Sequence, residues 1–267
     1  MSKIKDKQVL ITGGCSGIGK IMARKVLERG GSVVIWDINK ASIDKTTKEL
    51  ATLGSVVGFA VDISDKEQVA QVAKATEKSV GKVDILVNNA GIVVGKNFAE
   101  HSIAEIERTM QINTMGAMYI SHHFLKDMLL RNSGHICNIA SSAGLVGNPN
   151  MSVYAASKWA VTGWSESVRL ELRKMRSLVK VTTIMPYYIN TGMFDGVRSR
   201  IPILKPESAA ETIIRSIERN RKMRTLPGYL YSLTRFSQGI FSRSGFDFVA
   251  GKIFGIYNTM NDFKGRK

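Results

Sequence analysis

Two side chains with complementary acid–base chemistry lie four residues apart near the middle of the chain. Tyr154 and Lys158 occur in the segment VYAASKWA, and residues at this spacing share one face of a helix. A free tyrosine has a pKa of about 10 and is a poor base at neutral pH. A neighbouring ammonium favours the phenolate, so we expect Lys158 to lower the pKa of Tyr154 and make it a general acid or base. Such a pair is common by itself, and a surface hydrogen bond is the alternative interpretation.

A glycine-rich turn near the N-terminus could bind phosphate. In LITGGCSGIG, residues 10–19, the glycines Gly13, Gly17 and Gly19 let the chain turn sharply and let a pyrophosphate approach the backbone. The helix expected after them offers free N–H groups and the positive end of its dipole. The turn lies between a predicted strand and a predicted helix, which is the context that a dinucleotide site requires.

An acidic residue ends the second predicted strand. Asp37 closes the run SVVIWD, and a carboxylate at this place accepts hydrogen bonds from an adenosine 2′-hydroxyl and repels a 2′-phosphate. Neither Ser16 nor Ile38 is an arginine that could balance such a phosphate. The sequence therefore predicts NAD(H) rather than NADP(H) as cofactor. The alternative is that Asp37 only caps the next helix.

The elements that must position these residues alternate along the chain. Strands are predicted at Gln8–Thr12, Ser32–Asp37, Val56–Val61, Val83–Val87, His135–Ile139 and Val179–Ile184. Helices are predicted at Gly17–Glu28, Lys40–Leu50, Asp65–Ser79, Ile103–Leu130, Val153–Met175 and Pro206–Asn220. Strands that alternate with helices of about ten or more residues imply right-handed crossovers and a parallel sheet. We expect a single-domain α/β fold, a doubly wound (Rossmann-type) parallel sheet with helices on both faces.

The chain of 267 residues has the length of one α/β domain. We expect residues 1–226 to form the dinucleotide-binding and catalytic domain, and residues 227–267 to be a basic, aromatic-rich C-terminal extension of it. The net charge is +16, and the segment from Arg200 to Lys267 holds 13 Lys or Arg against 5 Asp or Glu. This extension is either a helical flap packed over a pocket or a partner subunit, or an amphipathic anchor at a membrane surface.

Composition favours a cytoplasmic protein, with peripheral contact at a membrane surface left open. The only two cysteines, Cys15 and Cys137, stand far apart, which favours a reduced setting. The first residues are polar, and no run of about 18 apolar residues would span a bilayer. We expect no nucleic acid partner, because no motif accompanies the charge. No metal site is expected either, because the histidines lack ligand spacing: His101, His122, His123 and His135.

Ser141 completes a constellation that resembles a known family. It directly follows the predicted strand His135–Ile139 and stands 13 residues before Tyr154. The turn TGGCSGIG, the segment NNAG at residues 88–91, Ser141 and the Tyr154/Lys158 pair together resemble the short-chain dehydrogenase/reductase family. The resemblance runs in order from Lys7 to about Asn220 and implies a Rossmann-type oxidoreductase.

The resemblance implies a role for each matching residue. Tyr154 would be the general acid/base, and Lys158 would lower its pKa and bind the nicotinamide ribose. Ser141 would hydrogen-bond the substrate oxygen, with Ser142 as the rival hydroxyl. Asn113, in MQINTMGA, would hold a water in a proton relay.

The cofactor would be held by residues from the whole domain. Asp62 would approach the adenine, Asn89 would support the sheet beside the cofactor, and Thr191 would contact the carboxamide. Where the family often has Pro-Gly, this chain has Pro186-Tyr187, so Tyr187 should narrow the space near the nicotinamide. The full expected set is Thr12, Gly13, Ser16, Gly17, Ile18, Gly19, Asp37, Asp62, Ile63, Asn89, Ala90, Gly91, Tyr154, Lys158, Pro186, Ile189 and Thr191.

Two segments, VVIWDIN and PYYINTGMFDG, resemble the branch that contains retinol dehydrogenases and 17β-hydroxysteroid dehydrogenases. We therefore expect hydride transfer between NAD(H) and a small hydrophobic alcohol or ketone, such as a retinoid, steroid or fatty alcohol. An apolar lid is expected at Tyr187–Leu204, and relatives suggest a homodimer or homotetramer. The alternatives are a 3-oxoacyl thioester reductase and a non-catalytic NAD(H)-binding protein of membrane surfaces.

Overall fold

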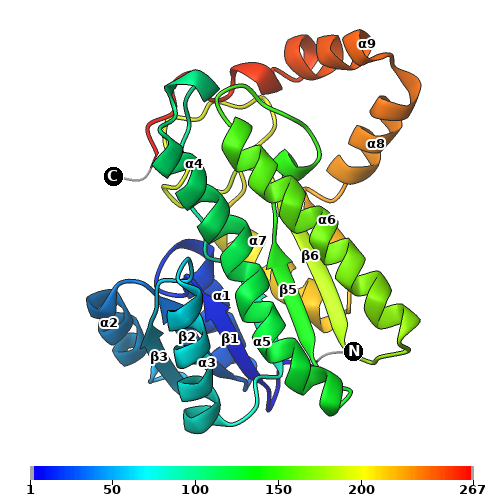
Figure 1. Cartoon of the computed structure of the whole chain (residues 1–267). Helices are drawn as coiled ribbons and strands as arrows, with labels where there is room; N and C mark the ends of the chain where they lie inside the picture. The colour runs from blue at the N-terminus through cyan, green and yellow to red at the C-terminus, as the bar shows by residue number, and fades with distance from the viewer. Residues whose placement is uncertain (1–2, 266–267) are drawn as a thin grey trace.

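Parallel strands form the centre of the protein (Figure 1). The computed structural model describes residues 3–265, so the outermost residues of the predicted domain and extension lie outside the described part. Within it, a seven-stranded sheet has the order β3-β2-β1-β4-β5-β6-β7. The strands are β1 (Gln8–Thr12), β2 (Ser32–Asp37), β3 (Val56–Ala60), β4 (Ile85–Asn88), β5 (His135–Ile139), β6 (Lys180–Pro186) and β7 (Met223–Leu226).

The strand order reverses between β1 and β4. The chain starts at β1, adds β2 and β3 on one side, and then returns to place β4 through β7 on the other. In open parallel sheets of this kind, ligands bind outside the carboxyl ends of the strands, at the point where the order reverses. The predicted doubly wound fold is confirmed, and the reversal shows where a ligand site should lie.

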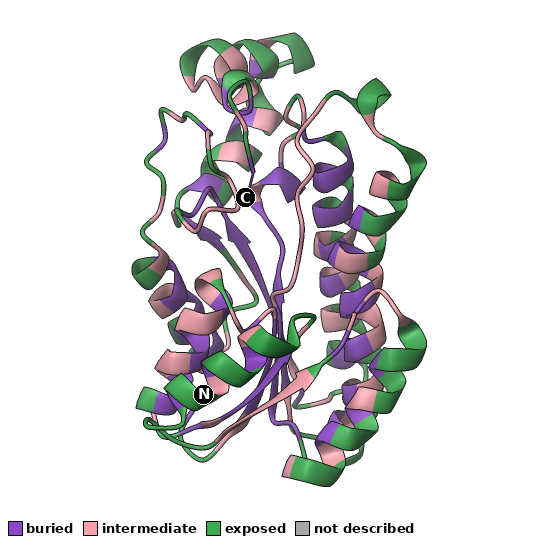
Figure 2. Cartoon of the chain, turned by 90° about the vertical axis from the view of Figure 1, so that its left-hand side faces the viewer, coloured by how far each residue is buried: buried purple, intermediate pink, exposed green. Residues whose placement is uncertain are grey.

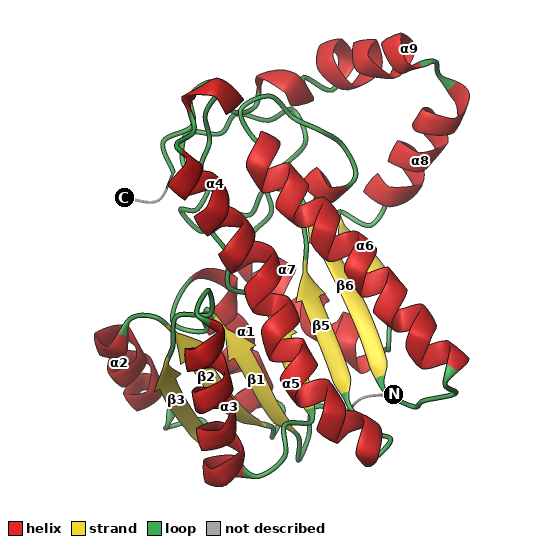
Figure 3. Cartoon of the chain, in the orientation of Figure 1, coloured by secondary structure: helices red, strands yellow, loops and turns green. Residues whose placement is uncertain are grey.

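Helices cover both faces of the sheet (Figure 3). They are α1 (Gly17–Glu28), α2 (Lys40–Leu50), α3 (Lys66–Val80), α4 (Ile103–Met110), α5 (Ala117–Leu130), α6 (Ser152–Lys174), α7 (Pro206–Glu218), α8 (Leu230–Ile240) and α9 (Arg243–Phe248). Side chains of a strand alternate between the two faces. Val9 and Ile11 accordingly join a core cluster with α1 and α7, whereas Leu10 joins one with α3 and α5. Figure 2 shows the resulting buried strands between helices whose outer surfaces are exposed.

Two features of the fold were not predicted. The predicted helix Ile103–Leu130 contains a π-helical segment, Gln111–Gly116, between α4 and α5. Gly116 lies against the segment after β3, and a Cβ there would stand 2.7 Å from the carbonyl oxygen of Ile63. The sheet also gains β7, which pairs with β6 and extends the ordered sheet to Leu226. The domain boundary at residue 226 stays a prediction.

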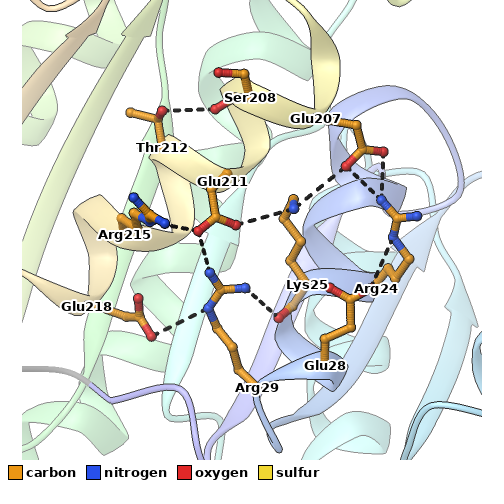
Figure 4. A network of polar contacts seen from close by, with 10 residues as sticks. All are labelled: Arg24, Lys25, Glu28, Arg29, Glu207, Ser208, Glu211, Thr212, Arg215 and Glu218. Carbon is orange, nitrogen blue, oxygen red and sulfur yellow. Dashed lines mark hydrogen bonds and ion pairs between the residues drawn. The ribbon is translucent and has the colours of Figure 1, made fainter.

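An ion-pair network joins α1 to α7 (Figure 4). Its central carboxylate, Glu211, lies 2.6 Å from Arg29, 3.3 Å from Lys25 and 2.7 Å from Arg215. Burial alone would raise the pKa of Glu211, but hydrogen bonds from Arg29 and Lys25 lower it to about 2. The network therefore holds the helix that follows the glycine turn against the last helix of the sheet domain. The remaining ion-pair partners drawn are Arg24, Glu28, Glu207 and Glu218.

The chain after β7 forms an arm that stands away from the sheet (Figure 1). We call residues 230–258 the C-terminal arm: α8, α9, a π-helical turn at Val249–Ile253 and a 3-10 turn at Ile256–Asn258. Beyond the arm, the backbone N–H of Lys264 donates to the carbonyl oxygen of Asp195 at 2.8 Å, which ties the chain end to the loop after β6. Across residues 3–265, no helix combines the length and the apolar character needed to cross a bilayer.

Candidate active site

The glycine turn after β1 is built for close backbone approach. Gly13 and Gly17 have φ values of +63° and +52°, a region that side chains with a Cβ rarely adopt. Gly19 has an ordinary φ, but a Cβ there would lie 2.1 Å from the carbonyl oxygen of Gly13. The first turn of α1 therefore packs directly on the loop, with its free N–H groups facing the same side.

Polar contacts from β4 fix this turn. The Thr12 hydroxyl oxygen accepts hydrogen bonds from the backbone N–H groups of Asn89, at 2.9 Å, and Ala90, at 3.0 Å. The Asn89 amide in turn donates to the carbonyl oxygen of Thr12 at 2.9 Å. These contacts join β1 and β4 where the strand order reverses, and they leave a glycine-walled cradle that suits the pyrophosphate of a dinucleotide.

Asp37 does not cap the next helix. The N-cap of α2 is Asn39, whose side chain accepts from the backbone N–H of Ser42 at 2.8 Å. Asp37 instead accepts from the backbone N–H of Cys15 at 3.1 Å, so its carboxylate lies beside the glycine turn. The structure thus removes the alternative interpretation of Asp37.

Tyr154 and Lys158 lie on the same face of α6, as expected from their spacing. The Lys158 Nζ is 5.7 Å from the centroid of the Tyr154 ring and donates to the carbonyl oxygen of Ile139 at 2.9 Å. Both residues are only 5% exposed. Ser141 follows β5 and reaches the same place, since its side chain hydrogen-bonds the Tyr154 phenol. Of the two rival hydroxyls, Ser141 is the one that meets the tyrosine.

The predicted lowering of the Tyr154 pKa by Lys158 is wrong for the protein alone. Burial raises the pKa of Tyr154 to about 12, and the hydrogen bond from Ser141 opposes this only in part. Burial also lowers the pKa of Lys158 to about 8. Loss of water disfavours the charged form of each group. The phenol is therefore protonated at neutral pH.

Asn113 lies in the π-helical turn and uses its side chain to hold the segment after β4. Its Oδ1 accepts from the backbone N–H of Ile92 at 2.8 Å, and its Nδ2 donates to the Ile92 carbonyl at 2.9 Å and to the Ser157 hydroxyl at 3.0 Å. These contacts connect that segment to α6. The expected water at Asn113 stays a prediction.

One cleft brings most of the expected site residues together at the carboxyl edge of the sheet. Six expected residues do not line it: Asp37, which ends β2, Asp62 and Ile63, which follow β3, and Thr12, Gly19 and Asn113. The expected residues that line the cleft are Gly13, Ser16, Gly17, Ile18, Asn89, Ala90, Gly91, Ser141, Tyr154, Lys158, Pro186, Ile189 and Thr191.

Part of the apolar wall beside Tyr154 comes from the lid expected at Tyr187–Leu204, which supplies Tyr188 and Phe194. The Phe194 ring packs edge-on against Tyr154, with centroids 5.9 Å apart, and against Tyr188, at 5.0 Å. Met151 also lines the cleft, as does Leu230 of the C-terminal arm. Leu230 belongs to the extension for which a flap over a pocket was one of the two expectations, whereas nothing in the sequence pointed to Met151.

Comparison with known proteins agrees with this geometry. A family model described as short chain dehydrogenase matches residues 7–202. Epidermal retinol dehydrogenase 2 of Mus musculus is 35% identical over 266 residues, covering 97% of this chain and 85% of that protein. The 17-beta-hydroxysteroid dehydrogenase 13 of Mus musculus is 33% identical over 230 residues, covering 85% and 76%.

Solved structures share the fold. A short chain dehydrogenase/reductase from Burkholderia phymatum in complex with NAD has a TM-score of 0.82 and 26% identity, covering 90% of this chain and 95% of that one. A metagenomic short-chain oxidoreductase in complex with NADP has a TM-score of 0.69 and 26% identity, covering 80% and 91%. Both adenine dinucleotides thus occur among similar structures.

Proposed function

Because this chain belongs to the short-chain dehydrogenase/reductase family of oxidoreductases, we propose that it transfers hydride between NAD(H) and a hydrophobic alcohol or ketone. One observation carries the proposal: Ser141, Tyr154 and Lys158 meet in the cleft that the glycine turn also lines. A protein that only binds a dinucleotide needs no buried phenol in contact with a serine hydroxyl. The arrangement supports an enzyme over the non-catalytic alternative.

The residues of the cleft divide the reaction between them. The nicotinamide, when bound, supplies or accepts the hydride at the substrate carbon. Tyr154 passes the proton at its phenolic oxygen to a substrate carbonyl during reduction and takes it back during oxidation. Ser141 orients the substrate oxygen towards this phenol, and Lys158 holds its amino group 5.7 Å from the centre of the Tyr154 ring, in the same cleft. Because the phenol is protonated at neutral pH in the protein alone, it is ready to donate in the direction of reduction.

The substrate class is argued from the wall opposite the glycine turn. Tyr188, Phe194, Met151 and Leu230 present rings and aliphatic chains to the space beside Tyr154. Mostly apolar pockets with a few polar groups bind apolar ligands and use the polar groups for orientation. Two of the relatives, a retinol dehydrogenase and a 17-beta-hydroxysteroid dehydrogenase by name, support the same class.

The cofactor preference is argued from Asp37. Its carboxylate lies next to the turn, at 3.1 Å from the Cys15 nitrogen, and would repel a 2′-phosphate. We therefore propose NAD(H) as the cofactor, in agreement with the NAD complex among similar structures.

We also propose that the C-terminal arm contacts an anionic lipid surface. Three of its four charged residues are basic, Arg235, Arg243 and Lys252, and one, Asp247, is acidic. The Asp247 carboxylate accepts a hydrogen bond from the Tyr257 hydroxyl at 2.6 Å. Exposed apolar side chains gather on the arm and the turn before it, namely Tyr229, Tyr231, Leu233, Phe236, Ile240, Phe241, Phe248 and Ile253. Aromatic and aliphatic side chains among cations are typical of helices that lie at a membrane surface.

A screen for NADH production tests the function. The purified chain is supplied with NAD⁺ and, in separate assays, a retinoid, a steroid, a fatty alcohol or a 3-hydroxyacyl thioester. We expect turnover of the apolar alcohols. In the matched variant Tyr154→Phe we expect NADH binding to persist while turnover falls by about 10²-fold or more. Near-normal turnover in this variant would remove the proposed role of Tyr154, and exclusive use of the thioester would replace the substrate class.

A further inference from the structure

A second hollow lies between the C-terminal arm and the body of the protein. Its walls come from the loop after β5, from α6 and from the arm. The residues that line it are Leu145, Val146, Gly147, Asn148, Pro149, Trp159, Gln238, Arg243, Phe246, Asp247 and Tyr257. None of the expected catalytic or cofactor-binding residues lines this hollow.

A single stretch of chain separates this hollow from the active-site cleft. Leu145, Val146 and Asn148 line both cavities. The stretch is held to the arm by the Gln238 side chain, which donates to the Leu145 carbonyl at 3.1 Å. The Oδ1 of Asn148 is buried and has no hydrogen-bond partner. The Nδ2 of the same side chain donates to the hydroxyl groups of Tyr188, at 3.1 Å, and Thr259, at 2.9 Å. The wall between the two cavities is therefore one stretch of chain with a few polar contacts to the arm and its surroundings.

The lining of the hollow suits an amphiphile. Leu145, Val146 and Phe246 supply apolar surface, while Arg243 and the hydrogen-bonded pair Asp247–Tyr257 supply polar groups on the side of the arm. A molecule with a long apolar chain and a hydroxyl could contact both kinds of surface. Fatty alcohols and retinoids have this character, whereas small polar alcohols do not.

We propose that the second hollow is the entrance through which a long-chain alcohol passes from a lipid surface at the arm to Tyr154. The inference rests on the proposed function, since it assigns a route to the substrate class named there. Passage needs the stretch from Leu145 to Asn148 to move, and the Gln238–Leu145 hydrogen bond is one contact that this movement breaks. Water-soluble substrates would not need the route, because the active-site cleft has its own opening.

Gly147 offers a way to block the entrance alone. It lines the second hollow but not the active-site cleft, and a Cβ there would meet nothing within 4 Å. Gly147→Phe should fill the hollow, and Gly147→Ala is the matched control that leaves it open.

The test compares oxidation of retinol delivered in anionic vesicles with oxidation of cyclohexanol in water. The expected result is a loss of tenfold or more in kcat/KM for retinol in Gly147→Phe, with cyclohexanol within twofold and vesicle binding unchanged. Equal losses of kcat/KM for both alcohols, or no loss for either, would contradict the proposed entrance.

A binding measurement separates this inference from the proposed function. Trp159 lines the hollow and is 45% exposed, so a long-chain alcohol brominated at its far end should quench its fluorescence. We expect saturable quenching in the wild type that is lost in Gly147→Phe and in Trp159→Phe, whose two remaining tryptophans give the background. Saturable quenching without turnover of any alcohol would contradict the proposed function but support the proposed entrance. Absence of saturable quenching would contradict the proposed entrance, whether or not the protein oxidises alcohols.

Discussion

The carboxylate of Asp37 accepts a hydrogen bond from the backbone N–H of Cys15 at 3.1 Å. The end of β2 is thereby joined to the glycine turn that follows β1. Under the proposed function the same carboxylate has two tasks: it supports the glycine turn, and it would present negative charge where a 2′-phosphate would lie.

Asp37→Asn separates these two tasks. The amide oxygen can still accept from Cys15, but the charge that repels a 2′-phosphate is gone. We expect the ratio of kcat/KM for NAD⁺ to that for NADP⁺ to fall about tenfold or more, with little change in thermal stability. Steady-state kinetics with both cofactors measures this ratio. Asp37→Ala is the comparison, since it should also lose the contact with the turn and lower the melting temperature. An unchanged ratio in Asp37→Asn would remove the basis for the NAD(H) preference.

Lys158 should make stability depend on pH. Burial lowers its pKa to about 8 from a usual value of 10.5, so between these values the unfolded chain holds a proton that the folded protein has lost. The contribution of Lys158 to the free energy of unfolding should therefore rise with pH across this window, by up to about 1.4 kcal/mol per unit. Burial raises the pKa of Cys15 and Cys137 from 9.0 and that of Tyr154 from 10.0, so above pH 9 these groups lose protons first in the unfolded chain and oppose the rise. Urea unfolding between pH 8 and pH 9 therefore measures the slope of Lys158.

The variant Lys158→Met should flatten this slope, because methionine has no proton to lose. Lys40→Met is the control, since Lys40 pairs with Asp44 at the surface with 73% of its side chain exposed. A slope in Lys158→Met equal to that of the wild type would show that the lysine is not the titrating group.

Replacing each of two helical glycines with alanine should change the stability of the protein in opposite directions. A Cβ at Gly19 would lie 2.1 Å from the Gly13 carbonyl oxygen, whereas one at Gly163, in α6, would meet nothing within 4 Å. Gly19→Ala should lower the free energy of unfolding by about 1–3 kcal/mol and weaken NADH binding, because the turn must shift. Gly163→Ala should raise it by about 0.5–1 kcal/mol. Urea unfolding and NADH fluorescence titration measure both effects. A Gly19→Ala protein with wild-type affinity and stability would contradict the close packing of α1 on the turn.

The ion pairs between α1 and α7 should depend on one carboxylate. Glu211 contacts Arg29, Lys25 and Arg215, and its side chain is 25% exposed. We expect Glu211→Gln to lower the free energy of unfolding by about 1 kcal/mol at neutral pH. Since the pKa of Glu211 is lowered to about 2 from 4.5, its contribution is complete above pH 4.5 and is lost as the pH falls towards 2.

The control for Glu211→Gln is the same substitution at Glu207, one helical turn earlier in α7. Glu207 also pairs with Arg24, but 57% of its side chain is exposed, so Glu207→Gln should have a smaller effect. Urea unfolding at pH 7 and pH 4 compares the two variants. An effect of Glu207→Gln that equals or exceeds that of Glu211→Gln would show that the network has no such centre.

Most of the fold follows from local patterns in the sequence. The buried strands are short apolar runs between amphipathic helices, and these patterns predict the element types and a parallel sheet, whereas the order of the strands comes from the structure. β7 escaped prediction because its four residues include the exposed Arg224 and show no clear apolar period. The π-helical turn was not predicted because no sequence pattern marks it, and the contact of its last residue, Gly116, with Ile63 exists only in the packed structure.

The candidate site divides in the same way. Motifs indicate the glycine turn, Ser141, Tyr154 and Lys158, because dinucleotide binding and proton transfer constrain both residue type and spacing. The apolar wall does not follow from a motif, since Met151, Phe194 and Leu230 come from distant segments that only tertiary packing brings together. The direction of the Tyr154 pKa was mispredicted for a related reason: burial depends on those same segments.

The position of the strands has a consequence for how this enzyme could be altered. Asp37 ends β2, whereas the loop that carries Tyr188 and Phe194 begins at the end of β6, four strand intervals away in the sheet, which at the usual spacing is about 19 Å. Changes at separations above about 10 Å without shared partners combine with nearly additive free energies. Substitutions that change the cofactor preference and substitutions that change the substrate preference can therefore be made separately, because each set should leave the binding free energy of the other ligand unchanged.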